Sequence, residues 1–319
     1  MAIADPMAAE MRQVDEVIHR RLTSNVALIN QIGHYIVSAG GKRIRPRLVL
    51  LFAQALNFEG PQRFELAATV EFIHTATLLH DDVVDESSLR RGRQTANALF
   101  GNAASVLVGD FLYSRAFQMM VSVHKPRVLE VLADATNVIA EGEVLQLMNM
   151  HDPDLAVDDY LRVIRYKTAK LFEASARLGA VLADSPPSLE EACADYGRSL
   201  GTAFQLVDDL LDYEGDTHAL GKNVGDDLRE GKPTLPLLLA MEQATDAERT
   251  MIRRAIEHGE TSRLADIITI VRRTGALQAT REAARVEADK ARNSAMALPD
   301  NSGREALLEL CVRSVERSS

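Results

Sequence analysis

The sequence predicts an all-α fold, and two observations carry this prediction. Apolar residues recur at intervals of three and four along most of the 319-residue chain, which is the spacing of one face of an α-helix. Glycine and proline are sparse, with 18 and 10 residues, so long helices can run without interruption. No alternation of apolar and polar residues between turns indicates a strand. Because no linker or change of composition divides the chain, we expect one helical domain over residues 1–319.

Five long segments carry the helical spacing, and residues that break helices separate them. The segments are residues 64–79, 103–123, 128–150, 160–182 and 189–213. The breaks are Gly40-Gly41, Gly60-Pro61, Lys125-Pro126, Asp152-Pro153 and Pro186-Pro187. We expect the helix that follows Asp152-Pro153 to be capped near Asp158. Helices of this length, rich in alanine and leucine, are typical of a large helical bundle.

Composition excludes some classes of function. The net charge is −10 and no basic stripe is present, which argues against a nucleic-acid-binding protein. Cys193 and Cys311 lack metal-ligand spacing, so we interpret them as reduced thiols. The N-terminus has no basic segment followed by an apolar one, and no apolar run reaches the length of a membrane span. We therefore expect a cytoplasmic protein with no transmembrane segment.

An aspartate-rich pentad, Asp81-Asp82-Val83-Val84-Asp85, ends the first of the long apolar segments. On a helix, Asp81 and Asp85 lie one above the other, and Asp82 lies about 100° around the axis. Carboxylates crowded beside an apolar run repel one another unless a cation neutralises them. Oxygen ligands favour a hard ion such as Mg²⁺, which combines one or two carboxylates with phosphate oxygens of a substrate. The pentad therefore predicts a magnesium site.

A second pentad of the same pattern, Asp208-Asp209-Leu210-Leu211-Asp212, ends the last long segment. Gln205 lies three residues before it, shares the face of Asp208, and has an amide that can hydrogen-bond a phosphate. One such pentad is equally well explained as a solvated acidic helix end. Two copies flanked by leucine and valine disfavour that explanation. If they face one another across a bundle, they would hold several Mg²⁺ ions around one diphosphate.

Basic residues gather near both pentads in the sequence. They are Lys42 and Arg45 in the segment GGKRIRP, the run Arg90-Arg91-Gly92-Arg93, Lys167 beside Thr168, and Lys222 and Lys232 in a glycine-rich loop. Each alone is explained as surface charge, but together they suit two diphosphates, one bridged by metal and one held by cations alone. His74 lies two turns before Asp81 on the same face, where packing and binding are equally good explanations.

Five motifs together resemble the trans-polyprenyl diphosphate synthases. They are GGKRIRP, LLHDDVVDESSLRRG, YKTAKLFEAS, GTAFQLVDDLLDY and GKNVGDDLREGKPTLPLLLA, in the order of that family and over nearly the whole chain. The resemblance implies an isoprenoid-synthase-type helical bundle around a deep central cavity, usually as a homodimer. It implies a prenyltransferase that condenses isopentenyl diphosphate with an allylic diphosphate, farnesyl diphosphate being the expected primer.

The resemblance also implies roles for individual residues. Those expected to bind Mg²⁺ are Asp81, Asp85, Asp208 and Asp212, with Asp82 and Asp209 in support. Those expected to bind isopentenyl diphosphate are Lys42, Arg45, His74 and Arg91. Those expected to bind the allylic diphosphate are Arg90, Lys167, Thr168, Gln205 and Lys222, with Lys167 also counted as catalytic beside the pentads. Metal and basic groups would stabilise the departing diphosphate, so that the allylic C–O bond ionises before the isopentenyl double bond attacks.

Small residues before the first pentad predict a long product. In the family, bulky side chains at these positions stop chain growth early, whereas this sequence has Ala76 and Thr77. Met120 and its neighbours are candidates for the floor of the tunnel, although methionine at such spacing is more often ordinary core. We expect an octaprenyl product for the side chain of a respiratory quinone. Nonaprenyl and shorter products, which rely on the same motifs, stay open.

Other classes of function explain less of the sequence. A class I terpene cyclase also uses an aspartate-rich metal site, but it needs neither a second diphosphate pocket nor a second such pentad. A non-catalytic subunit of a heteromeric synthase is expected to have lost aspartates from one pentad, and both pentads are intact here. A purely structural bundle leaves the carboxylates beside apolar runs unexplained. Transient membrane contact during product release fits a long apolar product, although no amphipathic anchor stands out.

Overall fold

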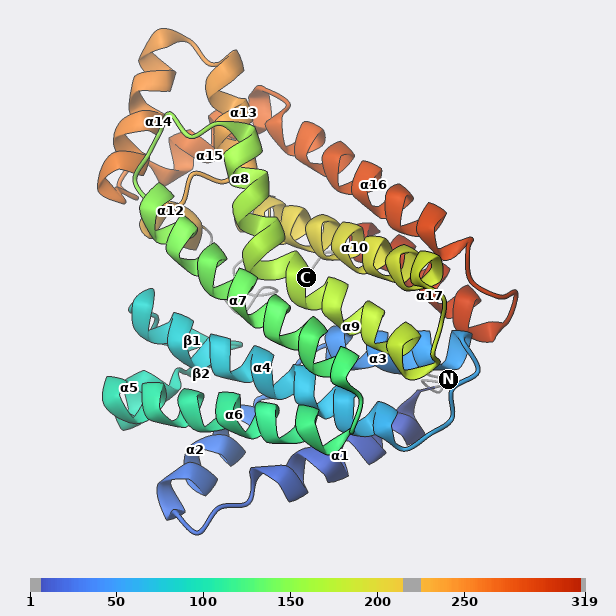
Figure 1. Cartoon of the computed structure of the whole chain (residues 1–319). Helices are drawn as coiled ribbons and strands as arrows, with labels where there is room; N and C mark the ends of the chain where they lie inside the picture. The colour runs from blue at the N-terminus through green and yellow to red at the C-terminus, as the bar shows by residue number, and fades with distance from the viewer. Residues whose placement is uncertain (1–6, 215–224, 317–319) are drawn as a thin grey trace, which may run out of the picture. The chain divides into compact units, whose positions relative to one another are not determined.

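The chain folds almost entirely into helices, in a computed structural model that describes residues 7–214 and 225–316 (Figure 1). Within these residues the only strands are β1 (Leu89–Arg90) and β2 (Arg93–Gln94), which pair antiparallel with Leu89 opposite Gln94. The prediction of an all-α fold is confirmed. The hairpin is too short to produce the alternating pattern by which a strand is recognised in a sequence.

The chain forms two compact units. The first unit comprises Met1–Thr136, Leu171–Gly197 and Ala295–Leu307, and the second comprises Asn137–Lys170, Arg198–Ser294 and Leu308–Ser319. Neither unit is continuous in sequence, since the chain passes from one to the other several times. The expectation of a single domain over the whole chain stays a prediction.

The helices of the first unit surround α4, which carries the first pentad at its end. They are α1 (Ala8–Leu22), α2 (Ala27–Ser38), α3 (Ile44–Ala55), α4 (Gln62–Val84), α5 (Ala96–Phe100), α6 (Asn102–Ser122), most of α9 (Lys170–Leu182) and the beginnings of α7 (Pro126–Asn149), α10 (Pro187–Glu214) and α17 (Ser302–Glu316). α4 and α6 lie side by side, and α3 and α1 also pack on α4 (Figure 1). Leu66, Val70, Ile73 and Leu79 of α4 are completely buried, which fixes the face that points inward.

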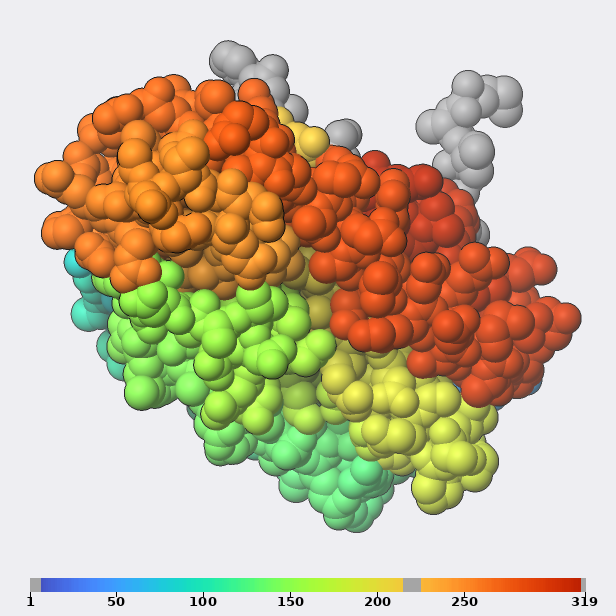
Figure 2. All heavy atoms as spheres, turned by 90° about the horizontal axis from the view of Figure 1, so that it is seen from above, coloured from blue at the N-terminus to red at the C-terminus, as the bar shows by residue number. Residues whose placement is uncertain are grey.

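The helices of the second unit pack around the end of α10, which carries the second pentad. They are α8 (Val157–Ile164), the short α12 (Asp226–Arg229), α13 (Leu235–Gln243), α14 (Asp246–His258), α15 (Leu264–Arg273) and α16 (Ala276–Ala295). Leu206, Leu210 and Tyr213 of α10 are buried in one cluster with Ile256 and Ile267. α13 to α16 form the orange part of the surface in Figure 2.

The predicted segment 160–182 differs from the structure in two ways. Its helix begins at Val157 after Ala156, with no capping side chain, so the predicted cap near Asp158 is wrong. Asp158 instead lies in the first turn, where a negative charge is favourable. The helix is also interrupted by a π-helical turn over Arg165–Ala169, which a pattern of three- and four-residue intervals does not reveal. The other four long segments are confirmed to within a few residues at each end.

No helix in residues 7–214 and 225–316 combines the length and apolar content that crossing a bilayer requires.

Candidate active site

The first pentad lies at the C-terminal end of α4, and its middle aspartate is the buried one. Asp82 is 1% exposed, whereas Asp81 and Asp85 are partly accessible. Arg90 of β1 donates from Nε to Asp82 Oδ1 at 2.7 Å, and its Nη2 lies 2.6 Å from the same oxygen. Burial raises the pKa of Asp82, and the hydrogen bond from Arg90 opposes that shift. The hairpin thus brings Arg90, a predicted ligand of the allylic diphosphate, back to the first pentad.

One oxygen of Asp82 is buried without a hydrogen-bond partner in the described part of the chain. This is Oδ2; the backbone carbonyl of the same residue accepts from Asn97 Nδ2 at 3.0 Å. A buried carboxylate oxygen without a partner is unfavourable, and a nearby cation or water would relieve that cost. The crowding of Asp81 and Asp85 beside it adds to the demand for a positive charge.

Arg45 and His74, both predicted to bind isopentenyl diphosphate, meet in the first unit. Arg45 Nη1 lies 3.2 Å from His74 Nε2, and the Arg45 guanidinium lies 4.5 Å from the centre of the Phe172 ring. Burial and the charges of three arginines hold the pKa of His74 well below its usual range, so the ring is neutral near pH 7. A guanidinium only donates, which makes Nε2 the acceptor and assigns the proton to Nδ1.

Arg91 and Lys42 lie on segments that flank this pair. The Arg91 guanidinium lies against Gly41, where an added Cβ would come within 2.8 Å of Nη1. Glycine at 41 therefore makes room for Arg91, a requirement additional to its backbone φ of 148°. Burial lowers the pKa of Arg91, and the carboxylate of Glu71 opposes that shift. Lys42 is exposed immediately before α3.

In the second pentad the middle aspartate is again the buried one, and the protein supplies donors to both of its oxygens. Asp209 is 4% exposed; Tyr160 donates its hydroxyl to Oδ2, and Gln205 Nε2 donates to Oδ1 at 2.7 Å. Thr168 in turn donates to Gln205 Oε1 at 3.0 Å. Burial and the charge of Asp227 raise the pKa of Asp209. The three residues predicted from sequence, Thr168, Gln205 and Asp209, are therefore brought together.

This arrangement occupies both ends of the Gln205 amide within the protein. A direct hydrogen bond from Gln205 to a diphosphate stays a prediction. The outer aspartates differ from Asp209, because Asp208 is exposed and Asp212 is partly accessible. Asp212 Oδ2 accepts from the backbone N–H of Asp227 at 3.2 Å, which ties the end of α10 to α12.

Lys167 lies on the π-helical turn and pairs with a residue that the sequence did not single out. Its Nζ lies 2.6 Å from Glu143 Oε2. At Gly142 a Cβ would come within 2.6 Å of the Lys167 backbone nitrogen, so α7 and the turn approach each other closely. Lys222, the other lysine predicted for the allylic diphosphate, lies outside the described residues.

Four residues of these networks were missed from sequence: Glu71, Glu143, Tyr160 and Asp227. Glu71, Glu143 and Tyr160 belong to none of the five motifs, whereas Asp227 lies in GKNVGDDLREGKPTLPLLLA but was given no role. Helical spacing was a usable signal for Glu71, which precedes His74 by three residues and shares its face. Asp227 lies two residues after Gly225, but nothing in the spacing connects it with the second pentad.

The chemistry of the donors fits Mg²⁺ held jointly with a substrate. Among the described residues, no three His, Cys, Asp or Glu side chains form a group that could hold a metal ion by themselves. Mg²⁺ does not need such a cage, since it is commonly bound through one or two carboxylates and phosphate oxygens. The partly accessible pair Asp81 and Asp85, with the partnerless oxygen of Asp82, suits that mode of binding.

The residues predicted to control product length belong to the first unit. Ala76 and Met120 are buried, at 0% and 1% exposure, and the Thr77 hydroxyl donates to the backbone oxygen of His74 at 2.9 Å. Their roles stay predictions.

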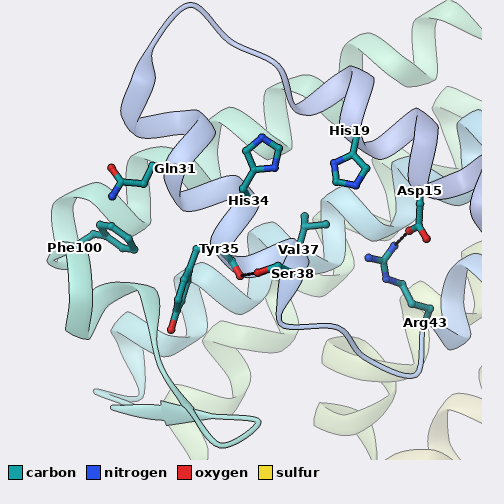
Figure 3. A pocket seen from close by; sticks show the side chains of 9 residues that line it. All are labelled: Asp15, His19, Gln31, His34, Tyr35, Val37, Ser38, Arg43 and Phe100. Atoms are coloured by element: carbon teal, nitrogen blue, oxygen red, sulfur yellow. Dashed lines mark hydrogen bonds and ion pairs between the residues drawn. The ribbon is translucent and has the colours of Figure 1, made fainter.

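A separate cavity of about 590 Å³ lies among α1, α2 and α5 (Figure 3). It is lined by Asp15, His19, Gln31, His34, Tyr35, Val37, Ser38, Arg43 and Phe100. None of these is a predicted site residue. Arg43 nevertheless connects the cavity with α4, because it pairs both with Asp15 at 3.0 Å and with Glu71 at 3.4 Å.

Comparison with known proteins assigns this constellation to a family. Residues 26–272 match the polyprenyl synthetase family. The chain is 57% identical to the octaprenyl diphosphate synthase of Escherichia coli K12 over 97% of its own length and 96% of the relative's. It is 45% identical to an all-trans-nonaprenyl-diphosphate synthase (geranyl-diphosphate specific) of Rhodobacter capsulatus, over 99% and 97%.

A solved structure agrees with these matches. A polyprenyl synthase from Caulobacter crescentus, complexed with calcium and isoprenyl diphosphate, aligns with a TM-score of 0.95 at 48% identity, over 98% of this chain and 96% of that one. The match at this identity extends over nearly the entire chain. The chain is therefore an enzyme of the polyprenyl synthetase family, a family of prenyltransferases.

Proposed function

We propose that this enzyme is a Mg²⁺-dependent octaprenyl diphosphate synthase. It adds isopentenyl diphosphate units head to tail to an allylic primer, farnesyl diphosphate being the expected one, and makes the side chain of a respiratory quinone. The observation that carries the proposal is the 57% identity to an octaprenyl diphosphate synthase over nearly the whole of both chains. The nonaprenyl synthase at 45% identity supports the runner-up, a product longer by one unit.

The protein's part in the reaction is to bind two diphosphates and to protect the allylic carbocation that forms when the C–O bond breaks. Arg45, Arg91 and Lys42 are proposed to hold isopentenyl diphosphate, with neutral His74 donating through Nδ1. Lys167 is proposed to turn from Glu143 to the allylic diphosphate, where Arg90 and Thr168 assist. The allylic C–O bond breaks and its electron pair leaves on the diphosphate. The isopentenyl double bond then supplies the electrons of the new C–C bond, and the released diphosphate accepts the proton whose loss restores an allylic diphosphate.

Mg²⁺ would be held by Asp81 and Asp85 of the first pentad and by Asp208 and Asp212 of the second. When bound, it neutralises charge on the departing diphosphate. The accessibility of the outer aspartates supports this assignment. Asp82 and Asp209 are proposed as supporting residues, because both are buried against donors of the protein.

A homodimer is proposed as the functional assembly, and α6 supports it. Leu107 and Val121 are 67% and 59% exposed, and Val106 and Phe117 are also exposed. The 3.6-residue turn places all four within about 100° of the helix circumference, so they form one apolar face. An apolar face of this kind on an otherwise polar surface marks an association site. The cytoplasmic location and transient membrane contact stay predictions.

Product analysis by mass spectrometry tests the proposed function. The purified protein is incubated with farnesyl diphosphate, isopentenyl diphosphate and Mg²⁺, with an EDTA control. The expected result is a metal-dependent linear polyprenyl diphosphate of eight units. A nine-unit product would favour the runner-up, and a cyclic hydrocarbon would point to a cyclase. No elongation by folded protein would instead indicate a subunit that needs a partner.

A further inference from the structure

We propose that Glu71 is a positioning residue for isopentenyl diphosphate: its carboxylate orders the arginines that hold this substrate. The inference rests on the proposed function, since it concerns the same diphosphate site. Glu71 lies on α4 three residues before His74, and its side chain is 14% exposed. It is not part of either pentad.

Glu71 is surrounded by cations from separate segments. Arg43, Arg45 and Arg91 each act on its carboxylate, and Arg43 Nε lies 3.4 Å from Oε1. Arg43 and Arg45 belong to the start of α3, whereas Arg91 lies in the hairpin turn between β1 and β2. Asp15 of α1 is the other carboxylate that acts on Glu71. One carboxylate of α4 thus faces two loops that both carry predicted ligands of the same diphosphate.

The backbone conformation of Arg43 requires an anchor. Arg43 and Arg91 have φ values of 50° and 53°, in the left-handed region that residues other than glycine rarely occupy. Such conformations persist only where surrounding interactions outweigh their cost. For Arg43 the interactions are ion pairs to Asp15 and Glu71 (the first is drawn in Figure 3). Arg91 is the first central residue of the two-residue hairpin turn, where a positive φ belongs to the turn itself, and its side chain lies against Gly41 within reach of the charge of Glu71.

Electrostatic attraction and the positioning of the arginines predict opposite effects on substrate binding when the Glu71 carboxylate is removed. A negative charge beside a diphosphate site repels the ligand, so removing it would tighten binding if attraction were all that mattered. Three guanidinium groups without a shared counter-ion repel one another, so removing it would disperse them and weaken binding if placement dominates. The left-handed backbone of Arg43 and the close seating of Arg91 against Gly41 favour placement. A preorganised array of donors binds more tightly than one that must be assembled.

The test compares Glu71→Gln with Glu65→Gln. Glu65 lies on the same helix, its side chain is 13% exposed, and it pairs with Arg21 and Arg20 at 2.5 and 3.3 Å, neither of which is a predicted ligand. Isopentenyl diphosphate alone is titrated by calorimetry, because without an allylic primer no reaction follows. KM for each substrate is measured in parallel, and melting temperature reports the structural cost of both variants.

We expect Glu71→Gln to weaken isopentenyl diphosphate binding at least tenfold, with KM for farnesyl diphosphate within twofold of wild type. Glu65→Gln should change neither. Glu71→Asp, which keeps the charge but is one methylene shorter, should fall between them, and it replaces the glutamine variant if that one does not fold. Unchanged or tighter binding would overturn the inference, as would an equal loss for both substrates. If the wild type itself bound no isopentenyl diphosphate, the proposed function would fall and the inference with it.

Discussion

At the scale of single residues, the two pentads show the same difference in burial between their middle and outer aspartates. The middle aspartate is buried and receives donors from the protein: Arg90 for Asp82, and Tyr160 with Gln205 for Asp209. The outer aspartates are left partly or fully accessible. A carboxylate held by protein donors stiffens the end of its helix, and the accessible ones can meet a metal and a substrate.

Removing the donor of one buried aspartate should be costly. Tyr160→Phe leaves Asp209 Oδ2 buried with one donor fewer, which should lower the free energy of unfolding by about 1–3 kcal/mol. Tyr213→Phe is the matched control: that hydroxyl is equally buried and lies near Thr234 without the geometry of a hydrogen bond. Urea unfolding of both variants measures the difference, and equal losses would show that the bond to Asp209 is not special.

His74 should make the enzyme less stable in acid. Its pKa is depressed in the folded state, so its contribution to stability is present above the unfolded value of 6.5 and is lost as pH falls below it. The melting temperature of the wild type should therefore fall between pH 7 and pH 5. His74→Gln removes the titrating group and should flatten this dependence. An identical pH profile in the variant would contradict a neutral, buried His74.

At the scale of elements, α4 carries both a predicted diphosphate ligand, His74, and the predicted control of product length. Ala76 is completely buried on this helix, five residues before Asp81. Ala76→Tyr puts a ring where the predicted tunnel runs, so products of fewer units should dominate in mass spectra. Ala76→Ser keeps a small side chain and should keep the long product. An unchanged product from a folded tyrosine variant would reject the tunnel at this position.

The sequence predicts the elements better than the contacts between them. Apolar spacing correctly located α4 and α10, and the pentads at their ends, because helical periodicity is written in the residues themselves. Apolar spacing did not reveal the π-helical turn that contains Lys167, because the wider turn leaves the local composition unchanged. Glu143 and Tyr160 meet their partners only through tertiary packing, across 24 and 49 residues of sequence. No local pattern encodes such pairings.

At the scale of the whole molecule, the apolar face of α6 should govern assembly. Leu107→Arg places a charge on that face, at its most exposed residue, and should convert a dimer into monomers in sedimentation experiments. Val286→Arg is the control, because Val286 is also exposed, at 47%, but lies on α16. If both variants sediment as the wild type does, the α6 face is not the contact between copies.

Because one oxygen of Asp82 has no hydrogen-bond partner among the described residues, a ligand that binds at the first pentad should raise the melting temperature of the protein. A ligand that binds only the folded chain stabilises it in proportion to the logarithm of its concentration above Kd. Mg²⁺ with inorganic diphosphate should therefore raise the melting temperature by several degrees, and Mg²⁺ alone by less, because the described carboxylates alone form no complete cage. Asp82→Asn should reduce the shift. Thermal shift thus gives a turnover-free assay, in which cations and diphosphates can be ranked before any product is made.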